Sequence, residues 1–202
     1  MSGTMRTFIA IELPESVKQR IAEVQEGLKR LDLPVRWIPP ENIHLTLRFL
    51  GDVDEQTLEA VKDAMGEAAA SCGPLELAAR GTGVFPNMRN PRILWIGVSG
   101  AVNELRELHE CLEVALARAG LPREERRFTA HLTMGRTRRR ISGRRLAEAL
   151  EEHLGFCTET FTADSIRLIK SDLTPDGAVY TPLHDSGLGP ESDGAPHGGK
   201  HG

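Results

Sequence analysis

Hydrophobic positions recur along the chain with two periods, one helical and one alternating, and together they predict its secondary structure. In residues 14–31, Val17, Ile21 and Val24 recur at three- and four-residue spacing, which is typical of one face of an α-helix. A proline stands at the start of this stretch, where it favours helix initiation. The same period and end signals predict helices over residues 14–31, 54–71, 101–120 and 142–153.

Runs of apolar and β-branched residues between these helices predict strands. The predicted strands cover residues 6–13, 35–38, 43–51, 75–85, 92–98, 129–136, 164–171 and 178–184. The last two flank a Pro-Asp-Gly turn at 175–177, which favours a β-hairpin. From Ser186 onward the chain is rich in Gly, Pro and His without an apolar period. We therefore expect one domain over residues 1–187 and a disordered tail over 188–202.

The two halves of the chain repeat the same order of elements. Phe8 precedes His44 by 36 residues and Ile93 precedes His131 by 38, with a predicted helix between them in each half. A repeated strand, helix and strand indicates duplication of a βαβ-like unit. The sequence therefore predicts a bilobal α+β fold, with two facing antiparallel-rich sheets, helices outside, and a pseudo-two-fold axis through a central cleft.

Composition limits the class of protein. Hydrophobic residues make up 40% of the 202 positions and charged residues 27%, which is ordinary for a soluble globular domain. No apolar run reaches the roughly 18 residues of a membrane span, and no secretory signal pattern opens the chain. Three cysteines without metal-type spacing favour a reduced, cytoplasmic protein. No dimerisation signature or obligate protein partner is evident, so we expect a monomer.

Charge is distributed unevenly. Between Arg123 and Arg145 there are nine arginines and two glutamates, so this segment carries +7 while the whole chain carries −4. The remainder is therefore −11. A local basic field on an acidic protein favours a polyanionic ligand, although a solvated arginine-rich loop would give the same pattern.

A His-Leu-Thr triplet occurs twice, at residues 44–46 and 131–133, each time inside a predicted strand. Seven histidines and thirteen threonines give roughly half a His-x-Thr by chance, so a single copy would carry little information. Two copies at matching positions of a repeat indicate a shared function.

Regular alternation along a strand predicts which side chains share a face. His44, Thr46 and Arg48 would lie on one face of the first strand, with Phe49 on the other. In the second strand Gly135 would share the motif face. Facing the two strands across the pseudo-two-fold axis then gives a cleft with two imidazoles and two hydroxyls.

Such a cleft suits the cleavage of a phosphate ester without a metal. A neutral imidazole can take a proton from water while a protonated one gives a proton to the leaving oxygen. Threonine hydroxyls donate to non-bridging phosphoryl oxygens, and Arg48 would add a cation. Zinc requires three or four ligands. Neither strand supplies a second ligand, so we expect no metal.

The motifs HLTL at 44–47 and HLTM at 131–134 resemble the paired His-x-Thr-x motifs of the two-histidine (2H) phosphoesterase superfamily. Within it the chain is most similar to the bacterial and archaeal RNA 2′,3′-cyclic phosphodiesterases, also described as 2′-5′ RNA ligases. The flanking stretches RTFIAIELPE, HLTLRFLGDV, PRILWIGV, FTAHLTMGR and SDLTPDGAVYTPL also fit. The resemblance covers roughly residues 5–188.

The resemblance implies that His44 and His131 are the catalytic pair and that Thr46 and Thr133 bind the phosphate. It implies hydrolysis of a 2′,3′-cyclic phosphate at an RNA end to a 2′-phosphomonoester, without a cofactor. Some members of the family also join or reopen 2′-5′ linkages. It favours His44 as the acid and His131 as the base. The near-equivalent repeats leave that order open from the residues alone.

Other residues near the motifs are weaker candidates. Arg136 ends the second motif strand and would point away from His131 in a regular strand, yet it could reach the cleft rim. Phe128 could stack a terminal base, although core packing is an alternative role for it. Arg138 and Arg139 lie beside the motif and could contact RNA phosphates, whereas Tyr180 is expected in the core.

Two other functions use the same residues. The site could act on a small cyclic nucleotide, such as an ADP-ribose cyclic phosphate, or on a 2′-5′ oligonucleotide. Alternatively, the chain could be an RNA-binding module whose imidazoles only hold phosphate. Arginine would hold phosphate better at neutral pH, so two titratable imidazoles favour an enzyme that acts on RNA ends.

Overall fold

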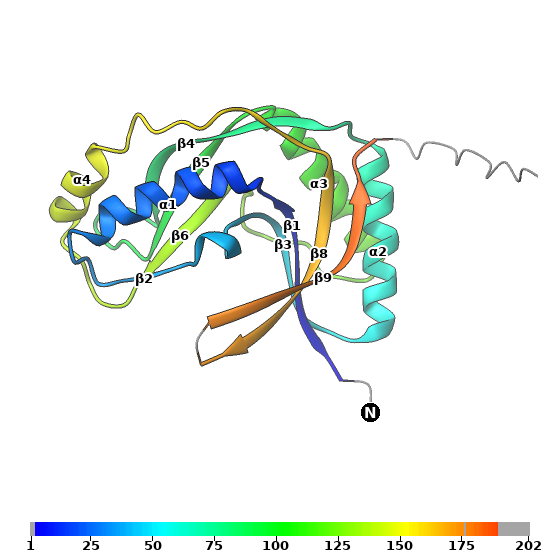
Figure 1. Ribbon diagram of the computed structural model, residues 1–202. Helices are drawn as coiled ribbons and strands as arrows, with labels where there is room; N and C mark the ends of the chain where they lie inside the picture. The colour runs from blue at the N-terminus through cyan, green and yellow to red at the C-terminus, as the bar shows by residue number, and fades with distance from the viewer. Residues whose placement is uncertain (1–2, 176, 190–202) are drawn as a thin grey trace, which may run out of the picture.

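The computed structural model describes residues 3–175 and 177–189, and it contains all four predicted helices (Figure 1). The helices are α1 (Glu15–Lys29), α2 (Glu55–Ala70), α3 (Val102–Arg118) and α4 (Gly143–Glu151). Asp54 caps α2, because its side chain accepts a hydrogen bond from the Thr57 N–H at 2.8 Å. In the described residues none of the helices is long and apolar enough to cross a membrane.

The strands form one curled, antiparallel sheet. They are β1 (Met5–Glu12), β2 (Val35–Trp37), β3 (His44–Val53), β4 (Leu75–Phe85), β5 (Ile93–Gly100), β6 (His131–Thr137), β7 (Phe161–Ala163), β8 (Ser165–Thr174) and β9 (Gly177–Gly187). Their order is β7-β4-β5-β6-β3-β1-β8-β9, and β2 pairs with β6. The sequence did not predict β7 or the short 3-10 helix Pro40–Asn42, whereas β2, which is equally short, was predicted because Pro39 and Pro40 mark its end.

The predicted duplication is visible in the pairing of the strands. In one lobe β1 pairs with β3, and in the other β5 pairs with β6, each antiparallel and each separated in the chain by a long helix. The repeated unit therefore differs from a parallel βαβ unit. The two lobes join where Leu45 of β3 pairs with Leu132 of β6. These are the central residues of the two motifs, so the pseudo-two-fold axis passes between the motif strands.

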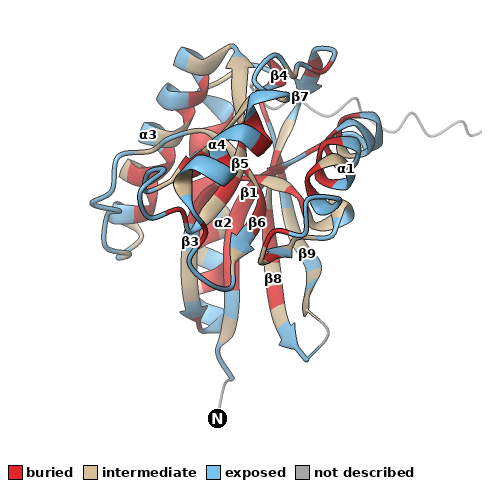
Figure 2. Ribbon diagram, turned by 90° about the vertical axis from the view of Figure 1, so that its left-hand side faces the viewer, coloured by how far each residue is buried: buried red, intermediate tan, exposed pale blue. Residues whose placement is uncertain are grey.

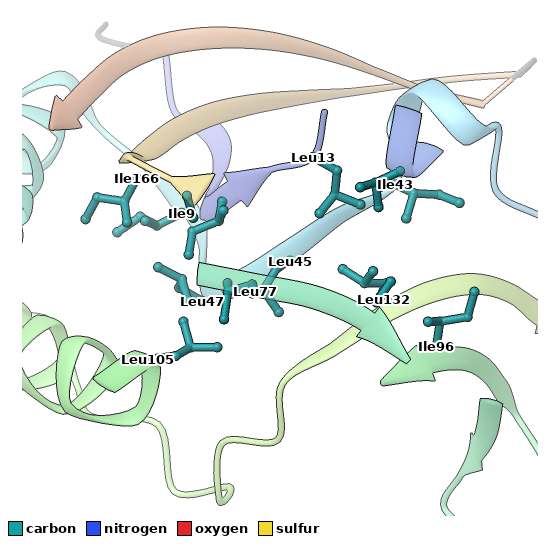
Figure 3. Packing of buried hydrophobic residues seen from close by; sticks show 14 of the residues in the cluster. Ile9, Leu13, Ile43, Leu45, Leu47, Leu77, Ile96, Leu105, Leu132 and Ile166 are labelled. Carbon is teal, nitrogen blue, oxygen red and sulfur yellow. The ribbon is translucent and has the colours of Figure 1, made fainter. Parts of the chain in front are cut away.

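The helices cover the outer face of the sheet. Helices α2 and α3 lie side by side at one end of the molecule, and α1 and α4 at the other (Figure 1). Their buried faces pack on the strands, and the exposed residues line the outside of the helices (Figure 2). Leu45 and Leu132 belong to this core, as do Leu47 and Leu77 (Figure 3). Burying both motif leucines turns the histidines and threonines to the opposite face.

The domain extends past the predicted boundary at residue 187. Leu188 is buried, and the Gly189 N–H donates a hydrogen bond to the Ala69 carbonyl at the end of α2. Residues 188 and 189 are therefore part of the folded domain, because Leu188 adds an apolar side chain to the core. The rest of the predicted tail, residues 190–202, lies outside the described residues.

Candidate active site

A cavity of about 500 Å³ lies at the junction of the two motif strands. Its wall contains His44 and Thr46 from β3 together with His131 and Thr133 from β6. The structure thus brings together the four residues that the repeated motif singled out. The antiparallel register through Leu45 and Leu132 sets His44 across from Thr133, and Thr46 across from His131.

Each catalytic candidate is oriented by the same backbone contact. The Nδ1 atom of His44 lies 2.9 Å from the Asn42 carbonyl oxygen, and that of His131 lies 2.7 Å from the Thr129 carbonyl oxygen. A carbonyl only accepts hydrogen bonds, so Nδ1 must carry the proton in both rings. The neutral tautomer therefore leaves each Nε2 with a lone pair that can take a proton.

The surroundings of His44 are aromatic. Its ring stacks on Phe8 with centroids 4.6 Å apart, and the Tyr180 ring meets it edge-on at 5.4 Å. Burial lowers the pKa of His44 to about 4, against the opposing effects of the Asn42 carbonyl and the Glu12 carboxylate. Burial therefore holds His44 in its neutral form at pH 7.

His131 is in a more open position. It meets the Phe85 ring in a T-shaped arrangement with centroids 5.0 Å apart, and no second aromatic ring encloses it among the described residues. Burial lowers the pKa of His131 as well, helped by the nearby charge of Arg136 and opposed by the bond to Thr129. Both imidazoles are thus shifted towards the neutral form, and His44 is the more strongly enclosed of the two.

A β-bulge follows the threonine in each motif strand. On β3, Thr46 pairs with Ala10 and Arg48 pairs with Ile9, so Leu47 is an extra residue. The equivalent extra residue on β6 is Met134. The first seven residues of both strands accordingly share one burial pattern, in which the sixth residue is exposed. An extra residue reverses the alternation that follows it and re-aims the later side chains.

The two bulges correct the predicted faces of both strands. Phe49, expected in the core, is 56% exposed and lines the cavity. Arg136, expected to point away from His131, lines the cavity at the equivalent position of β6. Gly135 instead faces β2, where a Cβ atom would meet Val35 Cγ1 at 2.6 Å. The prediction assumed unbroken alternation along each strand, so it assigned Phe49, Gly135 and Arg136 to the wrong faces.

Arg48 does not have the position that the sequence predicted. It is 7% exposed, and its guanidinium donates to the Glu113 carboxylate at 3.3 Å and to the Pro122 carbonyl. Arg48 therefore contributes to the wall of the cavity while its charge is neutralised by a buried carboxylate on α3. The bulge at Leu47 explains this, because it turns Arg48 towards the helices.

The remaining candidates divide between the cavity and the outside. Phe128 lines the cavity and stacks on His109 with centroids 4.1 Å apart. Arg138 and Arg139 follow the end of β6 and are not part of the cavity wall. Tyr180 was expected in the core, yet it lines the cavity because β9 passes beside β8 next to Phe8.

Sequence reasoning missed Phe49, His109 and Tyr180 as cavity residues. Phe49 could have been found only by anticipating the bulge, and His109 lies in a helix whose period is that of any amphipathic helix. Within the described residues, no three His, Cys, Asp or Glu side chains are grouped so that they could hold a metal ion.

Comparison with known families identifies the class of this protein. The family described as LigT like Phosphoesterase matches the chain twice in succession, over residues 11–95 and 96–180. Each match contains one of the two motif strands, which agrees with the duplication seen in the fold. The chain belongs to the LigT-like phosphoesterase family.

Individual relatives extend over most of the chain. The RNA 2′,3′-cyclic phosphodiesterase of Methanothermobacter thermautotrophicus is 33% identical, covering 89% of this chain and 96% of its own. The RNA 2′,3′-cyclic phosphodiesterase of Thermotoga maritima is also 33% identical, covering 90% of this chain and 94% of its own. A crystal structure from Thermus thermophilus has a TM-score of 0.76 at 28% identity, covering 93% of this chain and all of the other. Escherichia coli LigT shares the fold, with a TM-score of 0.75 at 23% identity, covering 93% of this chain and 99% of its own.

Proposed function

We propose that this enzyme hydrolyses the 2′,3′-cyclic phosphate at RNA ends to a 2′-phosphomonoester, without a metal, by acid–base catalysis with His44 and His131. The observation that carries the proposal is the pair of imidazoles, each with Nδ1 tied to a carbonyl and Nε2 available for proton transfer, in the wall of one cavity. Relatives that cover most of the chain bear the name RNA 2′,3′-cyclic phosphodiesterase, which supports this substrate.

The reaction needs one proton acceptor and one proton donor on opposite sides of phosphorus. One Nε2 accepts a proton from water while the water oxygen bonds to phosphorus. The bond from phosphorus to O3′ breaks, and the other imidazolium gives its Nε2 proton to O3′. The threonine hydroxyls of Thr46 and Thr133 donate to the non-bridging oxygens, where negative charge develops in the transition state. The product carries its phosphate on O2′.

We assign His44 as the acid and His131 as the base, which is the order that the family resemblance favours. Burial disfavours the charged form of His44, so this order requires the bound phosphate anion to raise the pKa of His44, and the face of Phe8 adds to the stabilisation of the imidazolium. The more open His131 suits the activation of water.

Phe49 and Arg136 are suited to hold the terminal nucleotide. Both are exposed residues that line the cavity next to the motif residues on their own strands. An exposed aromatic ring offers a stacking surface for a base, and an arginine can stack on a base or bind its phosphate. Escherichia coli LigT, 25% identical in a complex with NADP+, is a family member with a nucleotide bound.

Three further parts of the proposal concern the setting of the reaction. The three cysteines are unbonded, which supports a reduced, cytoplasmic location. We also propose that the enzyme is a monomer. A 5′-hydroxyl in place of water would attack the same cyclic phosphate, displace O3′ and join two RNA ends through a 2′-5′ linkage.

The decisive test is turnover of an RNA that ends in a 2′,3′-cyclic phosphate, measured in EDTA. We expect the wild type to release a 2′-phosphate end. His44→Ala and His131→Ala should each lower kcat by about 10²–10⁴-fold, the usual contribution of a general acid or base. RNA binding should persist in both variants, because neither change removes Phe49 or Arg136.

A matched control is His153→Ala, which removes a histidine from the far end of the molecule. Its turnover should equal that of the wild type. Loss of wild-type activity in EDTA would contradict metal independence. Turnover of small cyclic nucleotides or 2′-5′ oligonucleotides in place of cyclic-phosphate RNA would favour the alternative substrates. Binding without turnover of any of them would favour the RNA-binding module.

A further inference from the structure

One side of the cavity is formed by an irregular segment that the catalytic chemistry does not use. Residues 122–128, called here the arginine segment, lie in the connection between α3 and β6 and have no regular secondary structure. Glu124, Arg126, Arg127 and Phe128 of this segment line the cavity. The corresponding connection before β3 contributes Ile38 and Asn42 but no charged side chain. The cavity is therefore basic on one side only.

A buried ion pair fixes the arginine segment to the rest of the domain. Arg48 donates to the Pro122 carbonyl, and the Glu113 carboxylate accepts a hydrogen bond from the Glu124 N–H at 2.8 Å. Arg48 and Glu113 are themselves paired at 3.3 Å. At the other end of the segment, Phe128 stacks on His109 of α3. Both ends are thus held against β3 and α3, so the arginines between them have a defined position.

The charges of the segment are available to a ligand. Arg123 pairs with Glu110 outside the cavity. In the described part of the chain, Arg126 and Arg127 have no carboxylate within ion-pair distance, and both line the cavity. The Glu124 carboxylate lies 3.9 Å from Arg48. Glu113 already neutralises Arg48, so the Glu124 carboxylate offsets one of these two arginine charges, and the segment offers the cavity one net positive charge in addition to Arg136 on the catalytic strand.

We propose that the arginine segment is a second subsite, which binds the phosphodiester that joins the terminal nucleotide to the nucleotide before it. This inference rests on the proposed function and specifies its substrate as an oligonucleotide. A terminal nucleoside with a cyclic phosphate carries a single negative charge, for which Arg136 is sufficient. One internal phosphodiester adds a second negative charge, which matches the net positive charge that the arginine segment offers the cavity.

The size and asymmetry of the cavity support this assignment. A volume of about 500 Å³ is in the range of sites that enclose a drug-sized ligand, and it exceeds what one phosphate group requires. The pseudo-two-fold axis would accept a substrate in either direction. The arginine segment has no counterpart in the other lobe, so it gives the bound RNA one direction across the two histidines.

The test compares three substrates with the same reacting group. They are adenosine 2′,3′-cyclic phosphate, the same compound with a methyl phosphodiester on its 5′-oxygen, and the dinucleotide ApA ending in a 2′,3′-cyclic phosphate. We expect kcat/KM for the second and third to exceed that for the first by about tenfold or more, through KM, because charge-assisted hydrogen bonds to the phosphodiester are gained.

The variant Arg126→Ala/Arg127→Ala should abolish this preference while changing turnover of adenosine 2′,3′-cyclic phosphate by less than about twofold. Arg20→Ala/Arg30→Ala removes the same charge from α1 and its C-terminal end, outside the cavity, and should retain the preference. Equal kcat/KM for all three substrates would overturn the subsite and leave the proposed function intact. A higher kcat/KM for the dinucleotide alone would also overturn the subsite, because the phosphodiester would then not be the cause of the gain. Wild-type inactivity on all three would instead overturn the proposed function.

Discussion

The two motif strands share a backbone design and differ in the side chains that follow it. Both β3 and β6 present a histidine and a threonine, bury the leucine between them, and bulge at the next residue. After the bulge, β3 continues with Arg48 and Phe49, whereas β6 continues with Gly135 and Arg136. The shared part places two proton-transfer groups in matching positions, and the residues after the bulge make the two sides of the site different.

This difference explains how a duplicated unit can carry out an asymmetric reaction. A symmetric pair of imidazoles would have no preferred donor, because each would titrate as the other does. Enclosure by Phe8 and Tyr180 distinguishes His44 from the more open His131. After the bulge, β3 adds the buried ion pair of Arg48 with Glu113, and β6 adds the close approach of Gly135 to Val35. Each of these differences can be removed separately.

The largest effect is expected from the buried ion pair of Arg48, the residue that follows the bulge on β3. Glu113→Gln should lower the free energy of unfolding by about 3–5 kcal/mol, because the buried Arg48 charge loses its partner. The equivalent position on β6 should respond through packing. Gly135→Ala places a Cβ against Val35 and should cost about 1–3 kcal/mol.

Urea unfolding of both variants measures these losses. Glu110→Gln is the matched control, since it removes a carboxylate from an exposed ion pair with Arg123 and should cost about 0–1 kcal/mol. If Glu113→Gln is no more damaging than Glu110→Gln, the buried pair does not distinguish the two strands.

The pH dependence of kcat/KM should show a smaller but clear effect. Burial lowers the pKa of both His44 and His131, so above pH 6.5 the free enzyme is mainly in the form with both rings neutral. The reaction needs one of the rings protonated. We therefore expect kcat/KM to reach its maximum below pH 6.5 and to fall about tenfold per pH unit above it, or about 100-fold from pH 6.5 to 8.5. A constant kcat/KM from pH 6.5 to 8.5 would refute the lowered pKa values.

The smallest effects should come from the exposed residues that the bulges turn into the cavity. Phe49→Ala and Arg136→Ala should each raise KM for cyclic-phosphate RNA about tenfold with little change in kcat, because stacking or phosphate contacts are lost. Leu173→Ala removes a side chain that is 71% exposed on β8 and outside the cavity, and should leave KM unchanged. Unchanged KM in the two cavity variants would show that neither residue contacts the substrate.

The fold could be predicted from the sequence because its signals are periodic and repeated. The four helices and the long strands each carry enough apolar positions to define a period, and the spacing of Phe8 and His44 matches that of Ile93 and His131. β7 has three residues and carries no period, and unlike the equally short β2 it is not followed by prolines that mark its end. The antiparallel pairing of the repeated strands depends on contacts between residues far apart in the chain.

The candidate site could be predicted as far as the bulges. His44, Thr46, His131 and Thr133 precede the extra residues and share the cavity as alternation requires. Every position after them is shifted by a register that β1 and β5 impose, and nothing in the motif letters records that register. Arg48, Phe49 and Arg136 were therefore assigned to the wrong faces.

The most direct measurement of the two-histidine mechanism replaces the leaving oxygen. In a cyclic-phosphate substrate with sulfur at the 3′ bridging position, the leaving thiolate needs no proton, so loss of the general acid should matter little. We predict that His44→Ala regains most of the wild-type kcat on this substrate, while His131→Ala stays as impaired as on the oxygen substrate. Rescue of His131→Ala alone would exchange the two roles. Rescue of both variants, or of neither, would contradict a mechanism with one donor and one acceptor.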